Sequence, residues 1–240
     1  MELADGYADI FVAHPGKEPA PVVLFYMDGP GIREELHQMA RRFAEQGYYV
    51  VLPDLYYRSG AAGRPGERAT DPAAPEHEQM WQLIQSLTFP AVMADTTALL
   101  RWIDEQPEAD SSRIAAIGYC MSGRFAITAA ATWPDRIKAA ASIYGTSLVT
   151  DGDDSPHHIA AKARGALYFG FAELDQFAST ADIPAIEAAL KGAATKWTCE
   201  VFPGVDHGFA FPNRATYDAP SAELHWQRLF HLLDGELKNG

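Results

Sequence analysis

The sequence has only two cysteines among its 240 residues, which is too few for a disulfide framework. It has no run of eighteen apolar residues, so we expect no membrane-spanning helix and no membrane partner. Its first six residues have neither the basic start nor the apolar stretch of a secretory signal. Together these absences favour a cytoplasmic location, where reducing conditions keep a cysteine thiol free.

Basic residues are scarce too. Lysine and arginine number 19 against 32 aspartates and glutamates, which gives a formal net charge of −13. Nucleic-acid phosphates and anionic lipids repel a chain with this negative charge. We therefore expect no nucleic-acid partner. The eight histidines form no H-x-x-x-H pattern and no cluster with cysteine. We therefore expect no metal site and no cofactor.

What the sequence does have is an alternation of short apolar runs with amphipathic segments, in a length that suits one α/β domain over residues 1–240. The predicted strands are residues 21–26, 48–53, 113–117, 137–144, 165–171 and 197–202. The predicted helices are residues 34–46, 90–105, 125–131, 183–190 and 222–238. This alternation predicts a mainly parallel sheet covered by helices on both faces, with ligands at the carboxyl ends of the strands. Residues 58–77, rich in glycine, proline and alanine, predict a surface excursion near that site rather than a domain linker.

A strand, a tight turn and a helix follow one another around Cys120. The turn reads Gly118-Tyr119-Cys120-Met121-Ser122-Gly123. It resembles the Gly-x-Ser-x-Gly nucleophile elbow, with a thiol in place of the hydroxyl. Its small residues let such a turn close without a Cβ clash. The pattern predicts a cysteine presented above the carboxyl edge of the sheet, at the N-terminus of the next helix.

The alternative is a buried cysteine in an ordinary strand–helix turn, and the motif alone favours neither interpretation. The second cysteine, Cys199, lies within the predicted strand 197–202 and is best explained as a small buried apolar residue.

Two later loops complete a triad in the expected order. In folds of this type an acid and then a histidine follow the nucleophile along the chain, each on the loop after a strand. Asp175 follows the strand at 165–171, and His207 follows the strand at 197–202. The sequence therefore predicts that Cys120, Asp175 and His207 form a catalytic triad.

Each triad position has an alternative. Glu173 shares the loop of Asp175, although loop position favours Asp175. Asp206 adjoins His207, but neighbouring side chains on a loop rarely face each other, so Asp206 is better explained as a turn or capping residue. A loop histidine flanked by glycine can also be an ordinary surface residue.

The loop after the strand at 21–26 carries the remaining site predictions. In this architecture that loop supplies one backbone N–H to an oxyanion hole, and the residue after the nucleophile supplies the other. Gly29 and Met121 are therefore the predicted donors. Asp28 is unexpected there, because a fixed negative charge opposes a developing oxyanion. It is either a turn-forming residue or a partner of the cysteine thiol in the resting enzyme.

These features resemble the dienelactone hydrolase family, cysteine-dependent enzymes of the α/β-hydrolase fold. The resemblance extends from Val22 to about Trp226. It rests on Gln46-Gly47-Tyr48, on Pro53-Asp54-Leu55-Tyr56, on the Cys120 turn and on the Asp175 and His207 loops. It implies a triad of Cys120, Asp175 and His207. It also implies a thiol-holding carboxylate at Asp28, where the best-known members have glutamate.

The substrate anchors of that family are replaced in this sequence. The family holds the carboxylate of its lactone with two arginines, and the matching positions here are His77 and Phe211. Arg214, three residues beyond Phe211, is a candidate substitute or an ordinary surface arginine. Tyr26 is a further candidate substrate contact. A more apolar ester or lactone is therefore as plausible as the substrate that names the family.

We predict an enzyme, a monomer or weak homo-oligomer, that hydrolyses small carboxylic esters or lactones through a thioacyl intermediate. The alternatives are an acyltransferase or thioesterase, or a non-catalytic binding or redox-switch module with the same fold. A complete nucleophile–acid–histidine order favours the enzyme, because a binding module needs no triad.

Overall fold

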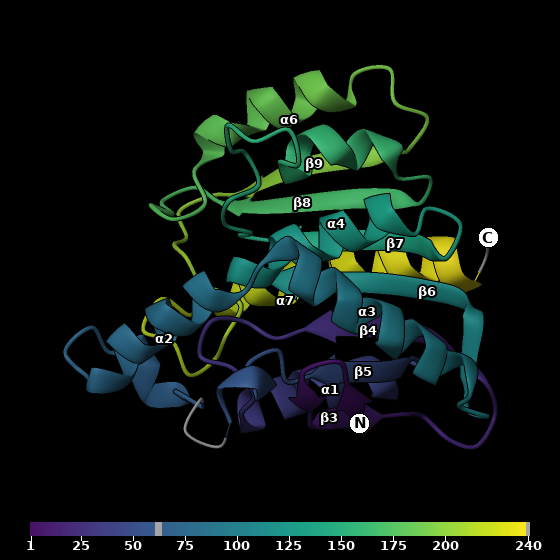
Figure 1. Ribbon diagram of the computed structural model, residues 1–240. Coiled ribbons are helices and arrows are strands. Elements are labelled where there is room, and N and C mark those ends of the chain that lie inside the picture. The colour runs from purple at the N-terminus through teal and green to yellow at the C-terminus, as the bar shows by residue number, and fades with distance from the viewer. Residues whose placement is uncertain (61–63, 239–240) are drawn as a thin grey trace. The chain divides into compact units, whose positions relative to one another are not determined.

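The computed structural model describes residues 1–60 and 64–238. Its contacts divide the chain into two compact units, Met1–Ser112 and Arg113–Gly240. Both units combine β-strands with helices, as Figure 1 shows.

The first unit contains both antiparallel and parallel strand pairs. Its strands are β1 (Glu2–Leu3), β2 (Gly6–Tyr7), β3 (Ile10–Ala13), β4 (Ala20–Tyr26) and β5 (Tyr49–Pro53), and its helices are α1 (Glu34–Glu45), α2 (Pro75–Ser86) and α3 (Phe89–Asp104). Strand β5 lies between β3 and β4, antiparallel to β3 and parallel to β4. Helix α1 contacts β3 and β5, and its apolar stripe of Leu36, Met39 and Phe43 is buried. Strands β1 and β2 form a separate antiparallel pair.

The second unit is built on four parallel strands. They are β6 (Ala109–Tyr119, which begins just before the unit boundary), β7 (Ile137–Ile143), β8 (Ala166–Ala172) and β9 (Trp197–Phe202), and the helices are α4 (Gly123–Thr132), α5 (Pro156–Ile159), α6 (Ile183–Leu190) and α7 (Ala219–Leu233). The strand order is β6-β7-β8-β9, and every neighbouring pair is parallel. Helix α4 packs on β7, and α7 contacts β7 and β8 from the other side (Figure 1). Because the strands are parallel, the loops that follow β6, β8 and β9 leave the sheet at one edge.

The predicted elements agree closely with the structure where their apolar pattern is strong. The predicted strand 197–202 and helix 183–190 have the same bounds as β9 and α6. Strand β6 begins four residues earlier than predicted, in polar sequence that carries no strand signal. The terminal helix begins at Ala219 and continues as a π-helix over Asp234–Lys238.

Five strands or α-helices were missed, and their sequences explain why. Strands β1, β2 and β3 are two to four residues long and helix α5 has four residues, which is too short to show a period. Helix α2 buries only Met80 and Leu83, so most of its surface is polar or exposed and the apolar stripe is narrow. Strand β3 pairs antiparallel with β5, within the mainly parallel sheet that was predicted.

The predicted excursion over residues 58–77 contains regular structure. Residues 61–63 lie outside the described residues. The remainder includes a 3₁₀ helix at Glu67–Thr70 and the first turn of α2. Arg58 donates hydrogen bonds to both Asp95 oxygens, at 2.7 and 2.8 Å, which anchors the start of the segment. Its nearness to the active site stays a prediction.

No single helix within the described residues is both long and apolar enough to cross a membrane. Helices α2 and α3 satisfy the criterion of length and composition only when joined, with an 80° bend between them.

Candidate active site

Cys120 stands at a strained turn between β6 and α4. Its φ of 54° is in the left-handed region that side chains with a Cβ rarely adopt. Residues Cys120–Ser122 form a 3₁₀ turn that leads directly into α4. Thr146, from the loop after β7, donates its backbone N–H to the Cys120 carbonyl at 3.0 Å and so holds the turn. The side chain of Cys120 is half-buried. Strain that the surrounding structure holds in place is a common property of functional sites.

The small residues of the turn are required by close backbone approach. A Cβ on Gly118 would lie 2.2 Å from the carbonyl oxygen of Ser122. A Cβ on Gly123 would lie 2.7 Å from the Cα of Gly145 and 2.2 Å from the Ser142 hydroxyl. The structure therefore confirms the predicted reason for glycine at these positions, which is that a Cβ would clash as the turn closes.

We expect Gly118→Ala to destabilise the protein by about 2 kcal/mol or more, because the added methyl group meets backbone that must move. The free energy of unfolding, measured by urea denaturation, tests this. Gly16→Ala is the matched control, since a Cβ there has nothing within 4 Å, and it should leave stability nearly unchanged. Equal stability of both variants would contradict the close packing of the turn.

The loops after β8 and β9 bring Asp175 to His207. The Nδ1 atom of His207 donates a hydrogen bond to Asp175 Oδ2 at 2.7 Å. The other carboxylate oxygen, Oδ1, accepts from the backbone amides of Phe177 and Ala178 at 2.7 and 3.0 Å. Asp175 is buried and both of its carboxylate oxygens are hydrogen-bonded, which fixes the carboxylate in one orientation. This contact leaves Nε2 of His207 to hydrogen-bond Cys120.

The charges around the imidazole favour its protonated form. Burial alone would lower the pKa of His207, but the Cys120 thiolate and Asp175 carboxylate outweigh it and raise this pKa to about 10. Burial likewise would raise the pKa of Asp175. The hydrogen bonds from His207 and from the two backbone amides lower it below its usual value. The imidazole is therefore favoured in its protonated form and is held by a buried carboxylate.

The two competing carboxylates have other partners. Glu173 accepts a hydrogen bond from the backbone N–H of Gly204 at 2.7 Å. Asp206 accepts from the backbone N–H of His207 at 2.6 Å, as a turn residue does. Of the three acids near this histidine, only Asp175 is bonded to its ring in the described structure.

The loop after β4 contains an ion pair that the sequence analysis missed. Asp28 accepts two hydrogen bonds from Arg33, at 2.5 Å to Oδ1 and 3.1 Å to Oδ2. Arg33 also bonds Glu35 Oε2, and all three side chains are buried. The Arg33 guanidinium, which Asp28 shares with Glu35, gives the buried carboxylate a charged partner and explains how it is tolerated in this loop. The sequence signal that could have indicated this ion pair is the arginine five positions after Asp28.

The predicted oxyanion donors lie in different units, Gly29 in the first and Met121 in the second. The Gly29 carbonyl accepts a hydrogen bond from the Tyr56 hydroxyl at 2.8 Å, which fixes that peptide. Met121 lies in the turn after Cys120 and is buried. Their joint role in an oxyanion hole, and the contact of Asp28 with the thiol, stay predictions.

Three of the four candidate substrate contacts are buried or already hydrogen-bonded in the structure, and contact of any of the four with substrate stays a prediction. Tyr26 is fully buried and its hydroxyl bonds Thr96 Oγ1 at 2.7 Å, so it is a core residue. The two ring nitrogens of His77 already bond the Ala69 carbonyl and the Trp81 indole N–H. The other two lie in the second unit. There Phe211 is 1% exposed and packs edge-on against Tyr119 and Tyr144, whereas the partly exposed Arg214 places its guanidinium 5.8 Å from the Phe211 ring.

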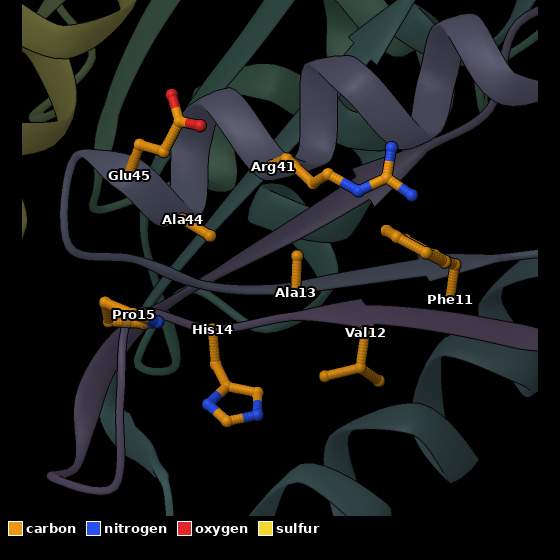
Figure 2. Close-up of a pocket in the computed structure, with 8 residues that line it drawn as sticks. All are labelled: Phe11, Val12, Ala13, His14, Pro15, Arg41, Ala44 and Glu45. Atoms are coloured by element: carbon orange, nitrogen blue, oxygen red, sulfur yellow. The ribbon is translucent and has the colours of Figure 1, made fainter.

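A hollow of about 530 Å³ lies elsewhere, between β3 and α1 of the first unit. Figure 2 shows Phe11 and Ala13 directed toward α1, and Val12 and His14 directed to the opposite side of the strand. None of the predicted catalytic residues lines this hollow. The candidate active site is therefore located by the hydrogen bonds at His207 and not by this hollow. Among the described residues, no group of three or more His, Cys, Asp or Glu side chains is placed to hold a metal ion.

A model of the dienelactone hydrolase family matches residues 8–237. The chain belongs to this family. A relative from Synechocystis sp. with the provisional name carboxymethylenebutenolidase is 28% identical over 222 residues, which cover 91% of this chain and 87% of the relative. A relative from Azospirillum brasilense with the same provisional name is 30% identical over 227 residues, covering 92% and 90%.

Solved structures agree on the fold of this dienelactone hydrolase family member. A provisionally assigned dienelactone hydrolase from Klebsiella pneumoniae has a TM-score of 0.79 at 22% identity, covering 95% of this chain and 99% of that one. The predicted α/β fold, with a mainly parallel, doubly covered sheet of the α/β-hydrolase type, is confirmed. Family membership also confirms the prediction of a carboxylic ester hydrolase of the dienelactone hydrolase type.

Proposed function

We propose that the protein hydrolyses small carboxylic esters or lactones, with Cys120 as nucleophile, His207 as acid and base, and Asp175 as the residue that orients the imidazole. The observation that carries this proposal is the hydrogen-bonded series from Asp175 through His207 to Cys120 within one unit. Membership of the family supports the ester-hydrolase part of this proposal, because the family and the relatives are named for the cleavage of lactones, which are cyclic esters. The roles of the three residues are the proposed part.

In the first step, the Cys120 thiolate adds to the ester carbonyl. The S–C bond forms while the carbonyl oxygen becomes an oxyanion, which the backbone N–H groups of Met121 and Gly29 would stabilise by about 3 kcal/mol each. The intermediate then collapses. Its C–O bond to the alcohol breaks, and Nε2 of His207 gives its proton to the departing alkoxide.

In the second step, neutral His207 takes a proton from water, whose oxygen adds to the thioester carbonyl. The S–C bond then breaks, the carboxylic acid leaves, and the thiolate and imidazolium pair are restored. Asp175 keeps Nδ1 protonated throughout, so that Nε2 always faces the reacting atoms. Because a thiolate is a better leaving group than an amine, esters with good leaving groups suit this site and amides do not.

A pre-steady-state experiment tests this mechanism. With p-nitrophenyl acetate we expect a burst of one p-nitrophenol per active site when deacylation is the slower step. Rapid acid quench and peptide mass spectrometry should then find one acetyl group on Cys120. In a separate assay, an added alcohol should accelerate turnover only if the enzyme is an acyltransferase. Turnover with no acetyl group on the thiol at any quench time would contradict the proposal.

A further inference from the structure

The loop of Asp175 is fixed against the loop of His207 by more than the bond between those two side chains. The backbone N–H of Glu173 donates to the Phe202 carbonyl at 3.0 Å. The next amide, that of Leu174, donates to the Val205 carbonyl at 2.9 Å. The backbone of the loop after β8 is therefore held against the loop that carries the imidazole.

One of these side chains, Phe177, lies against the imidazole and is open to solvent. Its ring centroid is 5.3 Å from that of His207, at an interplanar angle of 70°. Its backbone N–H is bonded to Asp175, so its position is set by the same carboxylate that orients the histidine. Yet 59% of its surface is exposed. A phenyl ring so exposed contributes little burial energy to folding, which leaves its presence at the site to be explained.

A second ring also touches the imidazole but is closed to ligands. The ring of Tyr144 lies 4.9 Å from that of His207, and Tyr144 is fully buried. Of the two aromatic rings at the His207 imidazole in the described part of the chain, only Phe177 offers an accessible apolar surface.

The chemistry of the first step says which part of a substrate lies beside this surface. His207 Nε2 must come within about 3 Å of the leaving oxygen to protonate it. The acyl carbon, in contrast, is bonded to the cysteine sulfur. The group that passes along the edge of the imidazole is therefore the substituent of the alcohol.

We propose that Phe177 determines specificity for the alcohol side of the ester, favouring flat or apolar leaving groups such as aryl and enol alcohols. The inference rests on the proposed function, because it assigns the leaving group to the side of His207. An aromatic ring recognises such groups by apolar contact and edge-to-face packing.

The test varies the alcohol at constant acyl group. We expect Phe177→Ala to lower kcat/KM for phenyl acetate about tenfold. The same variant should change kcat/KM for methyl acetate less than twofold. For phenyl acetate, the kcat/KM of Phe177→Leu, which keeps an apolar side chain, should lie between those of the unmodified enzyme and Phe177→Ala. Hydrolysis of the preformed acetyl enzyme, which no longer contains an alcohol, should proceed at the unmodified rate in all variants.

Leu174→Ala is the matched control. Leu174 is 56% exposed on the same loop, so its truncation removes a similar apolar surface. The ratio of kcat/KM between phenyl and methyl acetate should not change in this variant.

A uniform loss with both esters, together with slower deacylation, would overturn the inference, because Phe177 would then act only by positioning His207. An unchanged ratio in Phe177→Ala would overturn it as well. Failure of the proposed function is distinguishable, since it is seen in the unmodified enzyme as turnover with no acetyl group on Cys120.

Discussion

Replacing Cys120 by alanine is expected to lower kcat/KM for p-nitrophenyl acetate by about a thousandfold or more. In the proposed mechanism the substitution removes the sulfur that forms the thioacyl bond, and water must then attack without a covalent intermediate. Alanine also carries a Cβ, so the strain at φ 54° is retained and the turn keeps its shape. Initial rates at saturating and limiting ester concentrations, together with the unfolding midpoint, measure the effect.

Cys199→Ala is the control for this result. Cys199 lies on β9 and is half-buried, not fully buried as its sequence suggested. Burial and then the charge of Glu187 raise the pKa of its thiol to about 11, so it stays protonated at neutral pH. Its replacement should leave ester turnover within about twofold of the unmodified enzyme. Substantial activity in Cys120→Ala, or its loss in Cys199→Ala, would place the nucleophile elsewhere.

Replacing His207 by glutamine is the second substitution with a large expected effect. Glutamine can still donate to Asp175 but cannot transfer a proton, so we expect kcat to fall by about a thousandfold. Both half-reactions should slow, because the imidazole acts as acid in the first and as base in the second. Burst and steady-state rates report on the two separately. A variant with a normal burst would show that the histidine acts in deacylation alone.

The same variant should change how stability depends on pH. The pKa of His207 is raised from 6.5 to about 10 in the folded protein, so the protonated imidazole stabilises the fold. That contribution is fully present below about pH 6.5 and is lost as the pH rises through about 10. Urea denaturation at pH 6, 8 and 10 should therefore show a decline in unmodified protein that is smaller in His207→Gln. Parallel declines would contradict the charged pair.

Residues with a strong local signal could be placed from the sequence. Strand β9 and helix α6 had their bounds predicted because turn-forming residues follow each segment, Pro203-Gly204 after the strand and Lys191-Gly192 after the helix. The elbow could be recognised because only small residues fit its closure, and that constraint is visible in the letters themselves. The order of Cys120, Asp175 and His207 followed from the same reasoning, since parallel strands bring their following loops to one edge.

Residues whose environment depends on distant contacts could not be placed in this way. Tyr26 and Phe211 were candidates for substrate contact by position alone, and packing buries both. Asp28 looked like an isolated charge until the fold brought the Arg33 guanidinium onto it. Phe177 gave no signal at all, because an exposed phenylalanine on a loop is unremarkable until its ring is seen against the imidazole.

The sequence by itself determined the fold class, the family and the identity and order of the three candidate catalytic residues, because each depends on local pattern and on strand succession. Only the tertiary structure decided which acid bonds His207, which charge balances Asp28 and which aromatic ring borders the imidazole. Each of these contacts depends on the directions of side chains from different parts of the chain. Packing and electrostatics fix such directions over distances that no local pattern encodes.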